Sequence, residues 1–310
     1  ATEFINKNHI QGNFFNDFNS GAFLVGRCTP GFRVYIDGRT ELYGPQFFKE
    51  YMKILVEGDQ KAFAKAVEKY KITGVFLGSA HNRIGESILY HLSHNQDWVL
   101  VYLDNDAVIF LKDAAQNKAL ITKFRKDQKN LVFDNFDFQR LGSRGVFPYR
   151  EIKRAYNLEA IGFDELALKQ IKDALLISPG SSEPYYIRGM IFKKRGKYPE
   201  AFQDFRIATM ISPGDSDMRY GLGLMYATLG NYKKAIREYE TVLKTTTNRP
   251  EIFLSCAQAY LEDEQYQKAF AQCRKSFLLK PRNTTEIIKI AEGFVEKKQH
   301  AKAFEIYTMI

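Results

Sequence analysis

The chain has 310 residues, of which 45% are hydrophobic and 26% charged, as in an ordinary globular protein. No long apolar run of about 18 residues occurs, which excludes an evident membrane-spanning segment, and three cysteines are too few for a disulfide framework. The net charge of +9 lies wholly after residue 112, and we interpret it as solvated Lys-rich helix faces rather than a nucleic-acid interface.

Both ends of the chain bear on its origin. It begins at Ala1 without an initiator Met or signal-peptide pattern, and it ends at Ile310 inside an expected helix. We therefore expect a processed protein or a fragment.

Residues 1–112 alternate between strand-like and helix-like patterns, which predicts a small α/β domain with a mixed sheet. Helices are expected after Gly44-Pro45, after Asp59 as a cap, and over 83–94. Short apolar runs predict the strands 21–26, 32–36, 74–78, 98–103 and 107–111. The last two are expected to form a hairpin around Asp104-Asn105-Asp106.

Residues 113–147 are expected to be a loop-rich connector. Residues 114–124 are compatible with one helix, and Gly142-Ser143-Arg144-Gly145 is a break in regular structure. We expect this segment to pack on one or both of the flanking domains.

A step of 34 residues governs the rest of the chain. One series of small residues is Ala167, Ala201, Ala235, Ala269 and Ala303, and a second is Ala155, Gly189, Gly223, Ala257 and Ala291. Such spacing predicts stacked pairs of amphipathic helices, which cross closely at the small residues. Glycines mark the turn within the first three pairs, at Gly162, Gly196 and Gly230. Glu264 and Lys298 occupy that place in the last two pairs, where we expect a different turn.

This pattern resembles the tetratricopeptide repeat (TPR) family. The second unit carries the family's Tyr185, Gly189, Phe192, Gly196, Tyr198, Ala201, Phe205, Ala208 and Pro213. The resemblance implies an all-α, right-handed TPR solenoid over 148–310, with four full repeats and a truncated fifth. It also implies binding of a peptide or protein partner, without a cofactor.

In such a solenoid the first helix of each repeat lines a concave groove. The repeat register places Ile152 in this groove, together with the candidate partner-binding residues Tyr149, Tyr156, Glu183, Tyr186, Met190, Lys193, Asp217, Tyr220, Leu224, Glu251, Leu254 and Gln258. Exposed aromatic and apolar side chains beside charges are typical of a protein-binding surface. Burial of the same face under another part of the chain is the alternative.

The N-terminal part has a weaker resemblance. Residues 15–24, 34–44 and 98–104 are similar to the small extracytoplasmic α/β domain of bacterial membrane glycosyltransferases of the protein-mannosyltransferase type. This resemblance implies a missing membrane-embedded parent domain and an extracytoplasmic, periplasmic location in preference to a cytoplasmic one. The family's catalytic acid would lie in the missing part, so no catalytic residue is assigned here.

The first domain contains two groups of polar residues that are candidates for a binding, catalytic or metal site. One group is a candidate polar site made of Asp17, Asp37, Arg39 and Glu41, whose carboxylates and arginine could bind a sugar or act in acid–base catalysis. The favoured interpretation is structural: Arg39 pairs with Asp37 and holds the loop. His91 and His94 share a helix face near His81, yet no Cys or acidic ligand has a matching spacing, so we predict no metal site.

Cys256 and Cys273 lie on the two helices of one repeat, where we expect buried thiols and leave a disulfide open. The sequence as a whole favours a non-enzymatic protein–protein interaction module. The alternative is the soluble portion of a membrane glycosyltransferase that helps to position an acceptor or a lipid-linked sugar.

Overall fold

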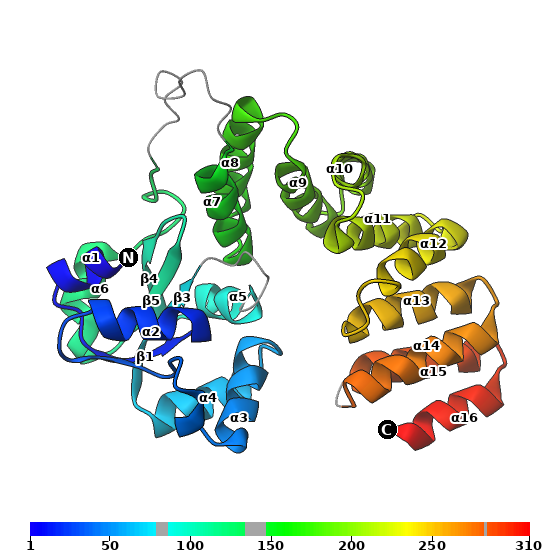
Figure 1. The fold of residues 1–310 in the computed structure, drawn as a ribbon, viewed down its shortest axis with the longest axis horizontal. Helices are drawn as coiled ribbons and strands as arrows, with labels where there is room; N and C mark the ends of the chain where they lie inside the picture. The colour runs from blue at the N-terminus through cyan, green and yellow to red at the C-terminus, as the bar shows by residue number, and fades with distance from the viewer. Residues whose placement is uncertain (79–85, 134–146, 282–283) are drawn as a thin grey trace. The chain divides into compact units, whose positions relative to one another are not determined.

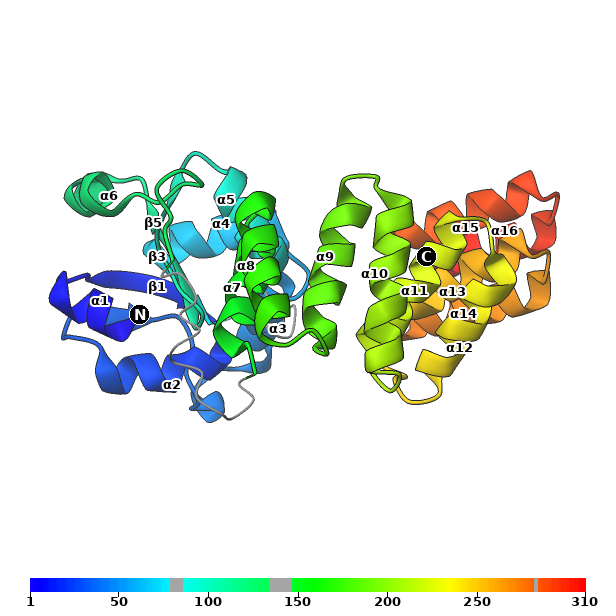
Figure 2. The same ribbon diagram turned by 90° about the horizontal axis from the view of Figure 1, so that it is seen from above.

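The computed structural model describes residues 1–78, 86–133, 147–281 and 284–310 (Figures 1 and 2). The chain forms two compact units, Ala1–Pro179 and Gly180–Ile310. Unit 1 contains a mixed sheet with helices around it, and unit 2 contains helices only among its described residues.

The sheet of unit 1 has five strands in the order β2-β1-β3-β5-β4. Their bounds are β1 Gly12–Asn16, β2 Phe32–Val34, β3 Ile72–Gly78, β4 Trp98–Leu103 and β5 Ala107–Lys112. β1 runs parallel to both β2 and β3, while β5 is antiparallel to β3 and β4. The carboxyl ends of β1 and β3 therefore share one edge of the sheet, and the start of β5 joins them there because Ala107 pairs with Gly78.

Helices cover both faces of this sheet, as Figure 2 shows. Side chains alternate along β1, so Phe14 joins a core with Ile5, Leu24 and Ile121 from α1, α2 and α6, whereas Phe15 packs on the opposite side. The helices are α1 Thr2–Lys7, α2 Phe18–Arg27, α3 Pro45–Leu55, α4 Gln60–Lys69, α5 Glu86–His94 and α6 Lys118–Phe124. Two short 3₁₀ turns lie at Thr40–Leu42 and Ala115–Asn117.

The sequence-based assignment at the start of the chain is wrong in two places. Residues 21–26, expected to be a strand, belong to helix α2, which Asp17 caps by accepting a hydrogen bond from the backbone N–H of Ser20. The strand at this end of the sheet is instead β1, Gly12–Asn16, which the sequence pattern did not reveal. A short apolar run does not distinguish a strand from a buried helix.

Several other local predictions for unit 1 are confirmed, although strand β2 ends at Val34, two residues before the expected end, and residues 114–124 form a 3₁₀ turn and helix α6 instead of one helix. Asp59 caps α4 through the backbone N–H of Ala62, and α3 begins at Pro45. β4 and β5 form the expected hairpin, in which the Asp104 carboxylate accepts hydrogen bonds from the N–H groups of Asp106 and Ala107. Residues 83–85 of the expected third helix lie outside the described residues, as do 134–146 of the connector.

Unit 1 extends past the expected boundary near residue 148. The first helix pair, α7 Tyr149–Ala160 and α8 Asp164–Ile177, belongs to this unit because α7 packs on α5 and the Asn157 side chain donates a hydrogen bond to the Asp104 carbonyl. The first repeat is thus fused to the α/β core.

Unit 2 consists of helices that stack in pairs, seen at the right of Figure 1. They are α9 Ser182–Lys194, α10 Tyr198–Ile211, α11 Ser216–Thr228, α12 Tyr232–Leu243, α13 Pro250–Glu262, α14 Tyr266–Leu279, α15 Thr284–Glu296 and α16 His300–Met309. The predicted small residues are buried between the helices, and a Cβ added to Gly223 would come within 2.6 Å of the Tyr239 ring. The helical-repeat architecture is confirmed.

One prediction about the turns within the pairs is wrong. Glu264 and Lys298 adopt φ of 60° and 59°, the same left-handed conformation that Gly162, Gly196 and Gly230 adopt. The last two pairs therefore use the same turn with residues that disfavour it.

Every helix among the described residues is too short or too polar to traverse a lipid bilayer.

Candidate functional site

The expected groove of unit 2 is a surface made by the first helices of successive pairs. α11 packs between α9 and α13, so their equivalent side chains form rows across the three helices. Met190, Tyr220 and Leu224 are half-buried. Glu183, Asp217 and Glu251 occupy equivalent positions in the first turns of the three helices, and we call them the acidic row. We refer to these six residues as the first-helix face.

Arg249 organises one end of the first-helix face. Its guanidinium contacts the Asp217 carboxylate at 2.5 Å and the Glu251 carboxylate at 2.7 Å. It also lies over the Tyr220 ring, 5.5 Å from the centroid. The Tyr220 and Ser255 hydroxyls are 2.9 Å apart, which adds a second link between α11 and α13. These contacts hold Asp217 and Glu251 of the acidic row in place before any partner arrives.

Arg249 was absent from the sequence-based site because it precedes the helix that the repeat register assigns to the groove. The useful signal was its position before Pro250, the first residue of α13. A long cation at that point can reach the first turn of the preceding first helix, where Asp217 lies.

Two of the expected groove residues in unit 2 are core residues. Tyr186 is 3% exposed and packs edge-on against Phe205, and Leu254 is 7% exposed within the core of the later pairs. Neither offers surface to a partner. Lys193 is half-buried, and Gln258 is exposed and donates a hydrogen bond to Glu262 one turn later.

Three further groove residues, Tyr149, Ile152 and Tyr156, belong to unit 1. Ile152 is buried, Tyr156 is half-buried, and Tyr149 is half exposed at the edge of a cleft within unit 1. The structure therefore assigns Tyr149 to a surface of the α/β unit.

The candidate polar site of unit 1 is held together by structural contacts. The Arg39 side chain binds the buried carboxylate of Asp37 with two nitrogens, Nε at 3.1 Å and Nη2 at 2.5 Å, and its backbone N–H donates to the same group. The Arg39 guanidinium holds the pKa of Asp37 below its usual range, although burial opposes this effect. Glu41 is exposed. The favoured interpretation, a pair that fixes the loop, agrees with this geometry.

Asp17 has a separate structural role. Its carboxylate accepts hydrogen bonds from the N–H and hydroxyl of Ser20, at 2.9 and 2.7 Å, and from the N–H of Gly78, at 2.7 Å. It therefore links the start of α2 to the end of β3. These bonds account for the Asp17 side chain by a structural role.

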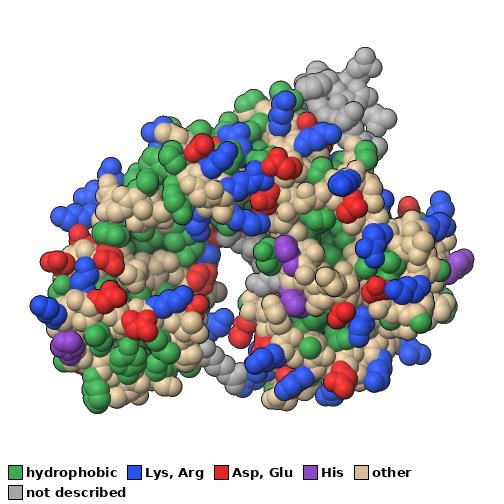
Figure 3. All heavy atoms as spheres, turned by 180° about the vertical axis from the view of Figure 1, so that it is seen from behind, with side chains coloured by type: hydrophobic (Ala, Val, Ile, Leu, Met, Phe, Trp, Pro, Cys, Tyr) green, Lys and Arg blue, Asp and Glu red, His purple; other side chains and the backbone are tan. Residues whose placement is uncertain are grey.

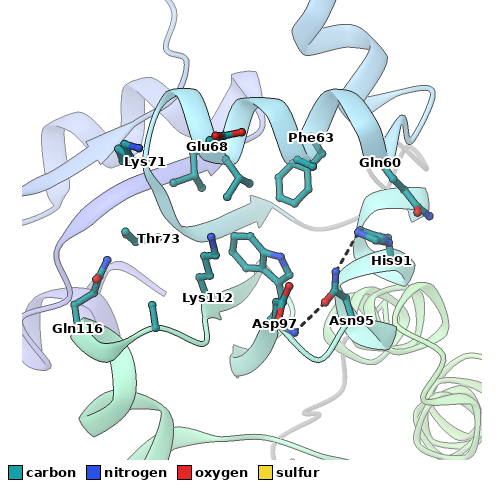
Figure 4. A pocket seen from close by; sticks show the side chains of 15 residues that line it. Gln60, Phe63, Glu68, Lys71, Thr73, His91, Asn95, Asp97, Lys112 and Gln116 are labelled. Atoms are coloured by element: carbon teal, nitrogen blue, oxygen red, sulfur yellow. Dashed lines mark hydrogen bonds between the residues drawn. The ribbon is translucent and has the colours of Figure 1, made fainter.

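A polar pocket of about 460 Å³ lies between α4, α5 and the sheet (Figure 4). Phe63 and Trp98 line it together with Lys71, Lys112 and Asp97. His91 borders the pocket beside Asn95, and burial lowers the pKa of this histidine. His94 instead stacks on Tyr90, and its Nδ1 lies 2.9 Å from both the Ser93 hydroxyl and the Tyr90 carbonyl.

The two histidines of α5 thus have different partners, and His81 lies outside the described residues. Among the residues that the structure describes, no three His, Cys, Asp or Glu side chains are close enough together to hold a metal ion. Cys256 and Cys273 are free, buried thiols, and burial raises the pKa of each to about 12.

Charges are mixed on the face of the molecule in Figure 3. Lys and Arg side chains are interspersed there with acidic and hydrophobic ones. This arrangement agrees with the interpretation of the positive charge as solvated helix surface.

Comparison with known proteins supports the repeat assignment. Residues 216–248, which contain α11 and α12, match the family model of the tetratricopeptide repeat. No curated protein matches the sequence. The resemblance of the N-terminal part to glycosyltransferase tails stays a prediction.

Several solved structures are similar in fold. YrrB, described as a TPR protein with an unusual peptide-binding site, is 19% identical with a TM-score of 0.47, over 55% of this chain and 87% of YrrB. MamA from Desulfovibrio magneticus RS-1 is 22% identical with a TM-score of 0.47, over 53% of this chain and 93% of the MamA chain. The C-terminal part of a TPR protein from Cytophaga hutchinsonii is 24% identical with a TM-score of 0.43, over 56% of this chain and 69% of that protein's chain.

The spacing of the small residues, the stacked helix pairs and the family match agree with one another. The chain is a helical repeat protein that carries a tetratricopeptide repeat at residues 216–248.

Proposed function

We propose that the chain is a non-enzymatic interaction module whose first-helix face binds a peptide or protein partner. The observation that carries this proposal is the continuity of the first-helix face across α9, α11 and α13. Half-buried Met190 and Leu224 supply apolar contact, and the acidic row Glu183, Asp217 and Glu251 borders them.

The chemistry of this face indicates the kind of partner. Arg249 neutralises only part of the acidic row, since it serves both Asp217 and Glu251. A segment with apolar side chains and a basic residue beside them would complement such a surface. The preset Arg249 contacts lower the cost of ordering the acidic side chains when the partner binds.

A glycosyltransferase-linked role receives less support from the site. Asp17, Asp37 and Arg39, the residues that motivated it, are engaged in contacts that fix α2 and the loop after β2. The extracytoplasmic location inferred from the N-terminal resemblance is kept as a proposal of its own.

The test is a peptide-display selection on the whole chain, followed by calorimetry with the selected peptides. Leu224→Gln and Met190→Gln should each weaken binding by about tenfold, because each removes apolar contact from the first-helix face. Met210→Gln is the matched control, since Met210 is 73% exposed on α10, away from this face.

Thermal melting of each variant separates lost binding from lost folding. Equal affinity of wild type, Leu224→Gln and Met190→Gln for every selected peptide would remove the first-helix face as the binding surface. Enrichment of apolar peptides with acidic rather than basic residues would contradict the expected charge of the partner.

A further inference from the structure

A second cleft, in unit 1, has features that the proposed function does not use. It has a volume of about 720 Å³ and lies at the carboxyl ends of β1 and β3. Asp17 and Gly78, which follow or end those strands, line it together with Ala107 at the start of β5. In open sheets with parallel strands, this edge is where ligands commonly bind.

The walls of this cleft are apolar and exposed to solvent. Phe23 on α2, Phe48 and Met52 on α3, Val56 just after α3, and Tyr149 on α7 are each between 36% and 54% exposed. Five large apolar side chains around one concavity are more than scattered surface residues. A cleft of this size with apolar walls suits a small ligand.

One charged side chain in the cleft lacks a counter-ion. Lys153 on α7 is only 7% exposed, and it makes no ion pair within 4 Å among the residues that the structure describes. Its ammonium lies over the Tyr149 ring, 5.3 Å from the centroid. Burial lowers the pKa of Lys153, and the more distant Asp106 opposes this effect. A buried ammonium without a counter-ion in contact is costly, and an anion would relieve that cost.

The two acidic residues of the cleft do not compensate the positive charge of Lys153. Asp17 is already compensated by three hydrogen bonds, from the N–H and hydroxyl of Ser20 and the N–H of Gly78. Asp106 is exposed to water at the rim. Lys153 is therefore the buried charge of the cleft that has capacity for a ligand.

We propose that this cleft binds a small anionic amphiphile. A carboxylate or phosphate head group contacts the Lys153 ammonium, and the apolar part of the ligand packs against Phe23, Phe48 and Met52. This site is independent of the first-helix face, since all of its residues lie in unit 1.

The experiment uses the whole chain with decanoate and decyl phosphate, each below its micellar concentration, and with decanol below its solubility limit. Affinity is measured by calorimetry. The site is located by NMR of ¹³C-labelled Met methyl groups, because Met52 is the single methionine of unit 1 among the six of the chain. Decanoate or decyl phosphate should shift the Met52 signal and bind at least tenfold more tightly than decanol.

Two variants test the two parts of the ligand. Lys153→Met should reduce the affinity for the two anions to the affinity for decanol. Phe48→Ala should weaken the binding of all three compounds. Lys49→Met, which removes an exposed lysine of α3, should bind the anions as the wild type does. Melting curves confirm that each variant is folded.

The outcomes decide between the alternatives. A preference for one of the two anions identifies the head group as a carboxylate or a phosphate. Decanol binding as tightly as both anions, unchanged anion affinity in Lys153→Met, shifts confined to methionines other than Met52, or no binding at all would each overturn the proposal.

Discussion

Arg188 on α9 and Asp204 on α10 form a two-bond ion pair that joins the helices of the second repeat. The Arg188 Nε and Nη2 atoms donate to the two carboxylate oxygens of Asp204 at 2.8 and 2.7 Å. The Asp204 side chain is 4% exposed, so its charge depends on this arginine for compensation.

Arg188→Gln should therefore destabilise unit 2 by about 3 kcal/mol, because it leaves a buried carboxylate without its cation. The measurement is the free energy of unfolding from urea titration. Arg237→Gln on the exposed face of α12 is the control, and we expect it to change stability by less than about 0.5 kcal/mol. Equal changes in the free energy of unfolding for the two substitutions would show that the buried ion pair contributes no more to stability than an exposed arginine does.

A double variant checks the reason for this loss. The corresponding positions in neighbouring repeats carry Leu222 and Gln170, both buried. Arg188→Leu with Asp204→Gln removes both charges together and should recover most of the stability that Arg188→Gln loses. A double variant as unstable as the single one would contradict the explanation.

Gly223→Ala should destabilise the third repeat by about 1–3 kcal/mol, since the new methyl group would come within 2.6 Å of the Tyr239 ring. Alanine normally stabilises a helix relative to glycine, so a loss of stability on this substitution would itself indicate a steric clash. Gly26→Ala in α2 is the matched control, because nothing lies within 4 Å of its added Cβ. Calorimetric melting should show opposite shifts for the two variants.

Glu264→Gly and Lys298→Gly should each stabilise the chain, by up to about 1 kcal/mol. Both residues have φ near 60°, a conformation that costs an L-residue energy but that glycine adopts freely. Gly230→Ala makes the reverse change at the equivalent turn and should destabilise by a similar amount. The check is the melting temperature, and a decrease in both glycine variants would contradict the prediction.

The repeat half of the fold was predictable because its pattern is local and repeated. Ala201 and Gly223 mark helix crossings wherever the 34-residue step places them, and the structure buries them there. The turn at Glu264 was not predictable from the residue itself, because the backbone hydrogen bonds that end helix α13, from the N–H groups of Glu264 and Gln265 to the Leu261 and Tyr260 carbonyls, hold Glu264 in a conformation that its own preference opposes.

The α/β half was harder to predict because its elements depend on distant partners. Helix α2 replaces an expected strand since Gly21 allows close approach to the Ile36 carbonyl, where a Cβ would lie 2.0 Å away. Tyr186 was expected at the surface, but it fills a gap against Phe205 of the next helix. Lys153 adjoins a predicted groove position, and only the fold shows that it is buried at a cleft of unit 1.

Thiol reactivity should separate the three cysteines. Cys256 and Cys273 are fully buried, and burial raises the pKa of each to about 12, so neither provides an accessible thiolate at pH 8. A chromogenic disulfide reagent should therefore react with no more than one thiol, that of partly exposed Cys28, in the folded chain, and with three in denaturant. Cys28→Ser should abolish the reaction of the folded chain, and rapid reaction that persists in this variant would contradict the assigned burial.

The Asp37–Arg39 pair predicts a specific dependence of stability on pH. Because Arg39 lowers the pKa of Asp37 in the folded state, the pair stabilises the fold fully above the unfolded-state pKa of about 4. That contribution is lost as the pH falls through the lower, folded-state pKa. Asp37→Asn should thus be less stable than wild type at pH 7, and the difference should shrink steadily below about pH 4.

The measurement is the free energy of unfolding of both proteins from pH 7 to pH 2. Glu41→Gln removes a carboxylate from the same loop at an exposed position, and it should leave the stability at pH 7 within about 0.5 kcal/mol of wild type. If wild type and Asp37→Asn differ by a constant amount over the whole range, the loop is fixed by the shape of the Asp37 side chain. A narrowing difference shows that the charge on Asp37 is what Arg39 holds.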